Sequence, residues 1–176
     1  NSLLDLVVFG RGTGKNIVEK FNKNRDSYKL DIDNKMFKET VLNLERLLDS
    51  NDTSTTGDLR IEMQETMQKY ASVFKSSDLL ETGYNNIQEI MKKKISIKDN
   101  TLIWNTDLVE ALEFKNMIAL AYITIGASLF REESRGSHYR YDFPERDDEN
   151  WMYHTLSWLR NDDLINKKSD VNFDGL

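Results

Sequence analysis

The residues best suited to chemistry lie in one stretch, FREESRGSHYRYDFPERDDENWMYHTL, at positions 130–156. It contains both histidines of the chain, His138 and His154, together with many carboxylates and arginines. Histidine and carboxylate side chains are the groups that most often transfer protons or bind metals. The separation of the two histidines, however, matches no metal-ligand motif and no nucleophile–histidine–carboxylate order. We therefore predict no metal site and no catalytic residue in this chain.

Four residues of this stretch, Glu133, Arg135, His138 and Arg140, favour a structural interpretation. Arginine presents a planar fork that pairs well with a carboxylate, and breaking a buried pair costs roughly 3–5 kcal/mol. We predict that the four side chains form a buried, hydrogen-bonded ion network. This network would fix the tail onto the rest of the chain and dock the helical part against further domains.

Composition excludes several classes of protein. The chain has 176 residues and a net charge of −6, which argues against a nucleic-acid surface because phosphate binding requires concentrated basic residues. It has no cysteine, so it has neither disulfides nor thiolate metal sites. The longest apolar run, residues 117–130, is too short to span a bilayer and is typical of a buried helix.

Apolar residues at helical spacing predict a short helix over 35–49 and three longer helices that begin near residues 59, 76 and 105. The expected core positions of the three longer helices are Leu59, Met63, Met67, Tyr70 and Phe74, then Leu80, Tyr84, Ile87, Ile90 and Met91, then Leu108, Leu112, Ala119, Tyr122, Gly126 and Leu129. Asn105 is expected to cap the third of these helices. Short links between long helices indicate an up-and-down arrangement. The predicted fold class is therefore mainly α, with an antiparallel three-helix bundle over residues 57–134.

The remaining segments are expected to be a linker with one short helix (25–56) and a loop-rich tail (135–176). Within the tail, MYHTLSWL alternates in polarity, Asn161-Asp162-Asp163 is typical of a turn, and residues 164–173 return as a second strand. We predict a docking loop followed by a short C-terminal β-hairpin.

The first 24 residues are expected to form a helix. Ser2 and Asp5 match the S-x-x-D pattern of a helix start, in which Ser2 caps the helix. The first half of this helix is apolar on nearly every side, so we expect it to be buried against protein that is absent from this chain. Gly10, Gly12 and Gly14 match neither the dinucleotide fingerprint nor the phosphate loop, and close helix packing explains them better.

Three separate blocks, NSLLDLVVFGR (1–11), WNTDLVE (104–110) and ESRG-x-H-x-R-x-D (133–142), resemble the flavoprotein subunit of succinate dehydrogenase and its relatives, fumarate reductase and L-aspartate oxidase. The resemblance implies that residues 1–24 are the last helix of an FAD-binding domain and that the bundle is spectrin-repeat-like. It also implies that Ser2 and Leu3 contact FAD, most of which is bound by the missing upstream part. A helix start presents free N–H groups, which would stabilise negative charge on a reduced flavin. Gly12-Thr13 departs from the family, which more often has alanine there.

The same resemblance implies a larger enzyme that oxidises succinate to fumarate with FAD and passes electrons to an iron–sulfur subunit and quinone. This fragment would supply a scaffold and a flavin-edge contact and would be inactive alone. The implied partners are the upstream FAD and capping domains, the iron–sulfur subunit and, indirectly, membrane anchor subunits, with no nucleic acid. The implied location is the cytoplasmic side of the bacterial inner membrane, with the mitochondrial matrix side as the alternative.

Two alternatives remain at this point. Residues 104–107 fit succinate dehydrogenase and fumarate reductase better than L-aspartate oxidase, and FPERDDENW (143–151) favours the dehydrogenase over fumarate reductase. The other alternative is a non-enzymatic three-helix interaction module. Such a module would leave the apolar first helix exposed, which argues against it.

Overall fold

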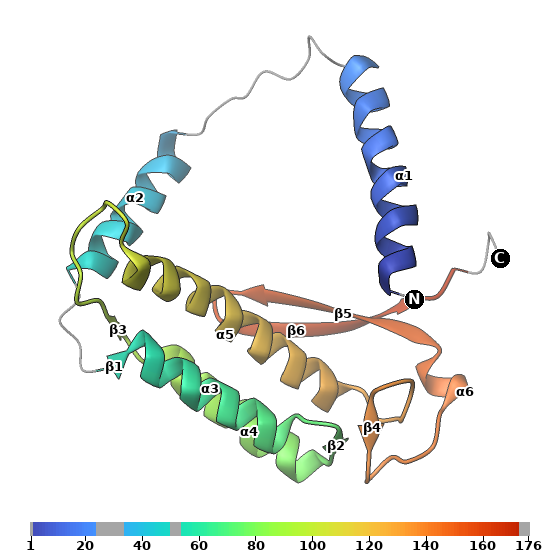
Figure 1. Ribbon diagram of the computed structural model, residues 1–176. Coiled ribbons are helices and arrows are strands. Elements are labelled where there is room, and N and C mark those ends of the chain that lie inside the picture. The colour runs from blue at the N-terminus through green and yellow to red at the C-terminus, as the bar shows by residue number, and fades with distance from the viewer. Residues whose placement is uncertain (1, 24–33, 50–53, 173–176) are drawn as a thin grey trace. The chain divides into compact units, whose positions relative to one another are not determined.

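The computed structural model describes residues 2–23, 34–49 and 54–172. Within these ranges the chain is mostly helical, with six helices and three short two-stranded sheets (Figure 1). It divides into two compact units, residues 1–42 and 43–176, which are described separately. No helix among the described residues has the length and apolar character needed to span a bilayer.

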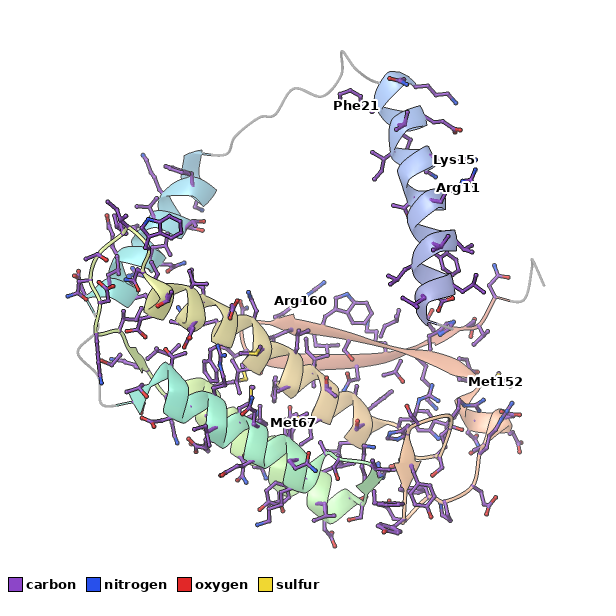
Figure 2. All side chains as sticks on the ribbon, in the orientation of Figure 1. Arg11, Lys15, Phe21, Met67, Met152 and Arg160 are labelled. Carbon is purple, nitrogen blue, oxygen red and sulfur yellow. The ribbon has the colours of Figure 1, made fainter. Side chains whose placement is uncertain are left out.

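The first unit contains helix α1 (Ser2–Lys23) and the start of α2 (Asn34–Leu48). Asp5 lies in the first turn of α1, and Lys20 and Lys23 lie in its last turn, so the charges complement the helix dipole. Figure 2 shows Phe21 on one side of α1 and Arg11 and Lys15 on the other. Large apolar side chains of α1 are exposed along its whole length: Leu3, Leu4, Leu6, Val7, Val8, Phe9, Ile17, Val18 and Phe21. The first unit by itself therefore leaves the apolar residues of this helix exposed.

The second unit is built on three helices, α3 (Thr56–Tyr70), α4 (Ser77–Lys92) and α5 (Thr106–Phe130), each of which contacts the other two. The buried apolar residues form one cluster: Leu47, Leu59, Met63, Leu80, Ile87, Ile90, Ile95, Ile97, Ala111, Phe114, Ile118, Ala121, Tyr122 and Ile125. Leu47 comes from the end of α2, and Ile95 and Ile97 come from the segment before α5. The core therefore lies between helices that are joined by short connections.

The beginnings of α3 and α5 are fixed by local side chains. Thr55 Oγ1 accepts a hydrogen bond from the Asp58 amide at 3.2 Å, and Asn105 Oδ1 accepts one from the Leu108 amide at 2.7 Å, as the sequence predicts for Asn105. Helix α4 differs, because the side chain of its N-cap residue, Ser76, makes no capping hydrogen bond. Its first turn is capped instead by a residue of the tail, as described below.

Two expected core positions were wrong. Helix α3 ends at Tyr70, and Phe74 lies in strand β2 (Phe74–Lys75), where its exposed ring packs against Tyr139 and Tyr141. Leu112 on α5 is also exposed. Because α5 is apolar on most sides, its sequence does not single out the buried face. The buried face of α5 includes the small residues Ala111, Ala121 and Gly126, which allow neighbouring elements to approach closely.

The predicted C-terminal hairpin is confirmed. Strands β5 (Tyr153–Arg160) and β6 (Asp163–Asp170) pair antiparallel, with Arg160 opposite Asp163. The two turn residues, Asn161 and Asp162, have φ of 50° and 66°. Positive φ at both positions is the requirement of the type I′ turn, which asparagine and aspartate tolerate well.

The hairpin packs directly on α5. Leu159 and Leu164 contact the core cluster, and Asn166 Nδ2 donates to the Gly126 carbonyl at 3.2 Å. A Cβ atom added at Gly126 would lie 2.1 Å from Leu164 Cδ2, so the absence of a side chain permits this approach. The remaining elements are two short parallel pairs and one short helix: β1 (Ser54–Thr55) with β3 (Ile95–Ser96), β2 with β4 (Tyr139–Arg140), and α6 (Asp148–Trp151).

Candidate functional site

The predicted charged cluster lies in the segment that connects the end of α5 to strand β5. A tight turn organises it, in which the Arg135 and His138 backbones exchange hydrogen bonds of 2.8 and 3.0 Å. Gly136 within this turn has φ of +60°, a conformation that favours glycine. Ser134 Oγ accepts a hydrogen bond from the Arg140 amide at 2.9 Å and donates one to the Phe143 carbonyl at 2.8 Å. The loop is thus held by its own backbone and by one serine.

Glu133 is the centre of one half of the cluster, and its side chain is completely buried. Its carboxylate accepts hydrogen bonds from Arg135 Nε at 2.8 Å, Arg135 Nη2 at 3.0 Å and the Asp147 amide at 3.0 Å. Arg131 Nη1 donates to the same carboxylate. One buried negative charge therefore binds two arginines that belong to different parts of the loop.

The surroundings of Glu133 determine its ionisation. Burial raises the pKa of this carboxyl, but the hydrogen bonds from Arg135, Arg131 and the Asp147 amide outweigh burial and hold the pKa at about 2. The hydrogen bonds that Arg135 donates to Glu133 and Asp148 in turn raise the pKa of Arg135 above its ordinary value. The pair is therefore fully ionised at neutral pH.

Arg140 is the centre of the other half of the cluster and is also completely buried. Its Nη1 donates to the carbonyls of Ser128, Leu129 and Arg131 at 3.1, 3.3 and 3.2 Å. These carbonyls lie at or just beyond the last turn of α5, which contains no basic residue of its own. A cation at the negative end of a helix is stabilising. Arg140, a residue of the tail, therefore caps the C-terminus of α5.

The partner of Arg140 is Asp142, which connects the same cluster to α4. Arg140 Nε donates to Asp142 Oδ1 at 2.8 Å, and Arg140 Nη2 donates to Asp142 Oδ2 at 2.7 Å. Asp142 Oδ2 also accepts hydrogen bonds from the Ser77 amide at 2.8 Å and the Ser77 hydroxyl at 2.6 Å. The hydrogen bonds from Arg140 and Ser77 lower the pKa of Asp142 well below its usual range. Asp142 therefore supplies the capping acceptor that Ser76 does not provide.

His138 takes no part in an ion pair. Its ring Nε2 lies 3.2 Å from the Arg131 carbonyl, so the ring donates its proton there. Burial lowers the pKa of His138, the hydrogen bond to the Arg131 carbonyl opposes this effect, and the nearby charges of Lys75, Arg140 and Arg131 lower the pKa further. His138 is thus a neutral donor to the backbone.

The structure brings the four predicted residues into one loop but divides them between two groups, one centred on Glu133 and one on Arg140. Glu133 pairs with Arg131 and Arg135, whereas Arg140 pairs with Asp142. The ring of His138 contacts the Arg131 carbonyl. The prediction missed Arg131, Asp142, Asp148 and Ser77. No short pattern in the sequence connects Ser77 to a residue in the tail.

The geometry favours a structural role for this loop. The hydrogen-bonding groups of Arg135 and Arg140 are directed at carboxylates, carbonyls and a hydroxyl of the chain itself. His154 is exposed on β5, and no group of histidine and acidic residues among the described positions is arranged to hold a metal. A shallow hollow beside the loop is lined by Arg131, Arg135 and His154, but the two arginines are already bound to Glu133. The hydrogen bonds of the loop therefore join helix ends.

The two predicted flavin contacts lie at the start of α1. Ser2 is the first residue of this helix, and its side chain lies outside the described part of the structure. Leu3 is 79% exposed, and the amides of a first helical turn have no partner within the helix. The flavin contact expected of Ser2 and Leu3 stays a prediction.

Comparison with known proteins gives a consistent set of similarities. Residues 60–176 match the family described as fumarate reductase flavoprotein C-term. The succinate dehydrogenase flavoprotein subunit of Rickettsia bellii is 42% identical over 159 residues, which cover 89% of this chain and 26% of that protein. The fumarate reductase flavoprotein subunit of Haemophilus influenzae is 29% identical over 160 residues, with 90% and 26% covered.

Among solved structures, the FrdA chain of an E. coli quinol fumarate reductase variant superposes with a TM-score of 0.90 at 26% identity. The superposition covers 100% of this chain and 31% of that one. The chain thus spans about a quarter of the length of the curated relatives it matches.

Proposed function

Since this chain belongs to the family of succinate dehydrogenase and fumarate reductase flavoprotein subunits, we propose that it is the C-terminal helical part of a succinate dehydrogenase flavoprotein. The observation that carries this choice is the higher sequence identity to relatives named succinate dehydrogenase than to the fumarate reductase of Haemophilus influenzae. In this proposal the whole subunit oxidises succinate to fumarate, and electrons continue to an iron–sulfur subunit and quinone. The chain alone does not turn over.

The contribution of this chain is structural. The buried Glu133 and Arg140 and their partners are directed at one another and at helix ends, which supports a scaffold role. We propose that α3, α4 and α5 form an antiparallel, spectrin-repeat-like bundle, because each of them packs on the other two. Residues 57–134 then make the bundle, 25–56 a linker with one short helix, and 135–176 the docking loop and hairpin.

The flavin contact is assigned to residues 1–24, as the last helix of the FAD-binding domain. Ser2 and Leu3 at the start of α1 would meet one edge of FAD, whose remaining contacts lie upstream. When bound, FAD supplies the hydride acceptor for succinate oxidation. The positive end of α1 stabilises negative charge at that edge. The apolar side chains of α1, exposed in the described chain, would be covered by the rest of that domain.

The proposed assembly includes the iron–sulfur subunit and, through it, membrane anchor subunits. The subunit would then be a peripheral protein on the cytoplasmic side of the bacterial inner membrane, with the mitochondrial matrix side as the alternative. The similarity to bacterial relatives supports the first location.

The complete flavoprotein subunit tests the proposed activity. We expect it to reduce an artificial electron acceptor when given succinate and to release no peroxide when given L-aspartate. Aspartate-dependent peroxide production would assign the chain to an L-aspartate oxidase. Fumarate reduction that is much faster than succinate oxidation would favour the second candidate, fumarate reductase, which the similarity to the E. coli structure supports.

A further inference from the structure

The loop between β3 and α5 carries three consecutive exposed apolar side chains. Leu102 and Ile103 are each 77% exposed, and Trp104 is 95% exposed. We call residues 102–104 the apolar tip. Single exposed apolar residues are ordinary on protein surfaces, but a run of three that includes a tryptophan is not. Tryptophan is also enriched among the residues that dominate binding energy at interfaces.

The apolar tip is held firmly in place. Asn105, which is buried, donates from Nδ2 to the Asp99 carbonyl and, at 2.8 Å, to the Thr101 carbonyl, so its amide closes the loop. Asp107 Oδ2 accepts a hydrogen bond from the Lys98 amide at 2.7 Å. The loop is thus fixed at both ends to the first turn of α5. Its exposed side chains are presented by a defined backbone.

Trp104 also adopts an unfavourable backbone conformation, with φ of 56°. Residues other than glycine, asparagine and aspartate rarely take this left-handed conformation, because Cβ then approaches the neighbouring backbone. Strain of this kind persists only where the surrounding structure imposes it, and it is found mostly at functional positions. Here the strain directs a large aromatic ring away from the chain.

We propose that the apolar tip is an anchor that inserts into an apolar recess on the upstream part of the same flavoprotein polypeptide. This inference rests on the proposed function. The relatives are about four times as long as the matched region, so a large protein surface of the same polypeptide remains to be placed. Helix α1 exposes a second apolar surface in the described chain, which also requires protein from outside it.

We place the recess on the same polypeptide because an exposed apolar tip has to be covered to avoid aggregation. A partner in the same chain is always present at high effective concentration, whereas a tip that waits for a separate subunit would favour aggregation. The recess is expected to be lined by apolar side chains and to contain one hydrogen-bond acceptor for the indole N–H, since a buried tryptophan needs such a partner. The anchor would fix the β3–α5 end of the helical domain.

Hydroxyl-radical footprinting with mass spectrometry tests this proposal. Trypsin cleavage after Lys98 and Lys115 gives a peptide that contains Trp104 as its only tryptophan and contains no methionine. We expect Trp104 to be oxidised about tenfold more slowly in the complete flavoprotein subunit, purified without its partners, than in the 176-residue chain. Continued oxidation in the subunit, with protection only after the iron–sulfur subunit is added, would assign the anchor to that partner and overturn the proposal. Equal oxidation in all three samples would also overturn it.

A pair of variants tests the anchor without relying on the solvent accessibility of Trp104. In the complete subunit, Trp104→Ala should speed trypsin cleavage at Lys98 by about tenfold, because the loop loses its anchor and opens locally. Ile61→Ala removes another exposed apolar side chain, on α3, and should leave that rate unchanged. In the 176-residue chain neither variant should alter it. An unchanged rate for Trp104→Ala in the complete subunit would refute the anchor.

The proposed activity and the proposed anchor can be refuted independently of each other. Succinate oxidation and bound FAD are measured on the same subunit preparations. Protection of Trp104 in a subunit that does not oxidise succinate would support the anchor and refute the proposed activity. An active subunit in which Trp104 stays accessible would support the proposed activity and refute the anchor.

Discussion

Replacement of Glu133 by glutamine removes the charge at the centre of the buried network while keeping the shape of the side chain. The carboxylate binds Arg131 and Arg135 and is completely buried, so the variant removes the counter-charge of Arg131 and leaves Arg135 with its second, more exposed partner, Asp148. The pKa of Glu133 falls from its ordinary 4.5 to about 2 in the folded chain. Each pKa unit corresponds to about 1.4 kcal/mol, so ionised Glu133 contributes roughly 3–4 kcal/mol to stability. Loss of one partner of a buried ion pair costs a similar amount, roughly 3–5 kcal/mol.

Urea unfolding of the 176-residue chain, followed by tryptophan fluorescence, measures this effect. Near pH 7 we expect Glu133→Gln to lower the free energy of unfolding by about 3 kcal/mol. The matched control is Glu132→Gln, which makes the same change at the exposed neighbouring position and should alter stability by less than about 0.5 kcal/mol.

The pH dependence gives a second, independent check. The folded-state pKa of Glu133 is depressed, so its contribution is present above pH 4.5 and is lost as the pH falls toward about 2. The difference between the wild-type chain and Glu133→Gln should therefore shrink across this window. Carboxylates remote from Glu133 titrate alike in both proteins and cancel in the difference. A loss below about 1 kcal/mol near pH 7, or a difference that does not change with pH, would refute the reasoning.

Three further predictions concern the helix ends and the hairpin. Arg140→Met should destabilise the chain by about 3 kcal/mol or more, because Asp142 and the last carbonyls of α5 lose their buried cation. Urea unfolding measures this change, and a loss of stability below about 1 kcal/mol would contradict the prediction. Gly126→Ala should cost about 1–3 kcal/mol and speed proteolysis in the β5–β6 turn, because the added methyl collides with Leu164, and unchanged proteolysis would contradict this. Asn105→Ala should cost at least about 1 kcal/mol through loss of the α5 cap, and an unchanged melting temperature would show that the cap is unimportant.

Features that depend on neighbouring residues were predictable from the sequence. Asn105 caps α5 through the Leu108 amide, and Asn161-Asp162 forms the turn of the predicted hairpin. Both rest on the preference of short polar side chains for particular backbone conformations, which acts within a few residues. The order of the helices followed in the same way from their apolar spacing.

Features that depend on contacts between distant segments were not predictable. The sequence indicated an ion network around Glu133 and Arg140 but not its division into two groups. Asp142 caps α4 at Ser77, 65 residues earlier in the chain, and no local pattern identifies such a partner. Apolar periodicity also continued past the end of α3 to Phe74, because the pattern does not show where tertiary contacts end a helix.

The candidate flavin contact at Ser2 and Leu3 came from the resemblance alone and stays a prediction. The exposure of Leu3 and of the other apolar residues of α1 agrees with it but does not test it.

The central claim is that the buried charged loop around Glu133 and Arg140 supports the enzyme without taking part in its chemistry, and Arg135→Ala in the complete subunit tests it most directly. Arg146→Ala is the matched control, because Arg146 pairs with the same Asp148 but is exposed. FAD content and succinate turnover are measured on the same preparations. We expect Arg135→Ala to lower the yield of folded, FAD-containing subunit while turnover per bound FAD stays near the wild-type value. Normal yield and normal FAD content with lost turnover would contradict the claim and place Arg135 in the reaction itself.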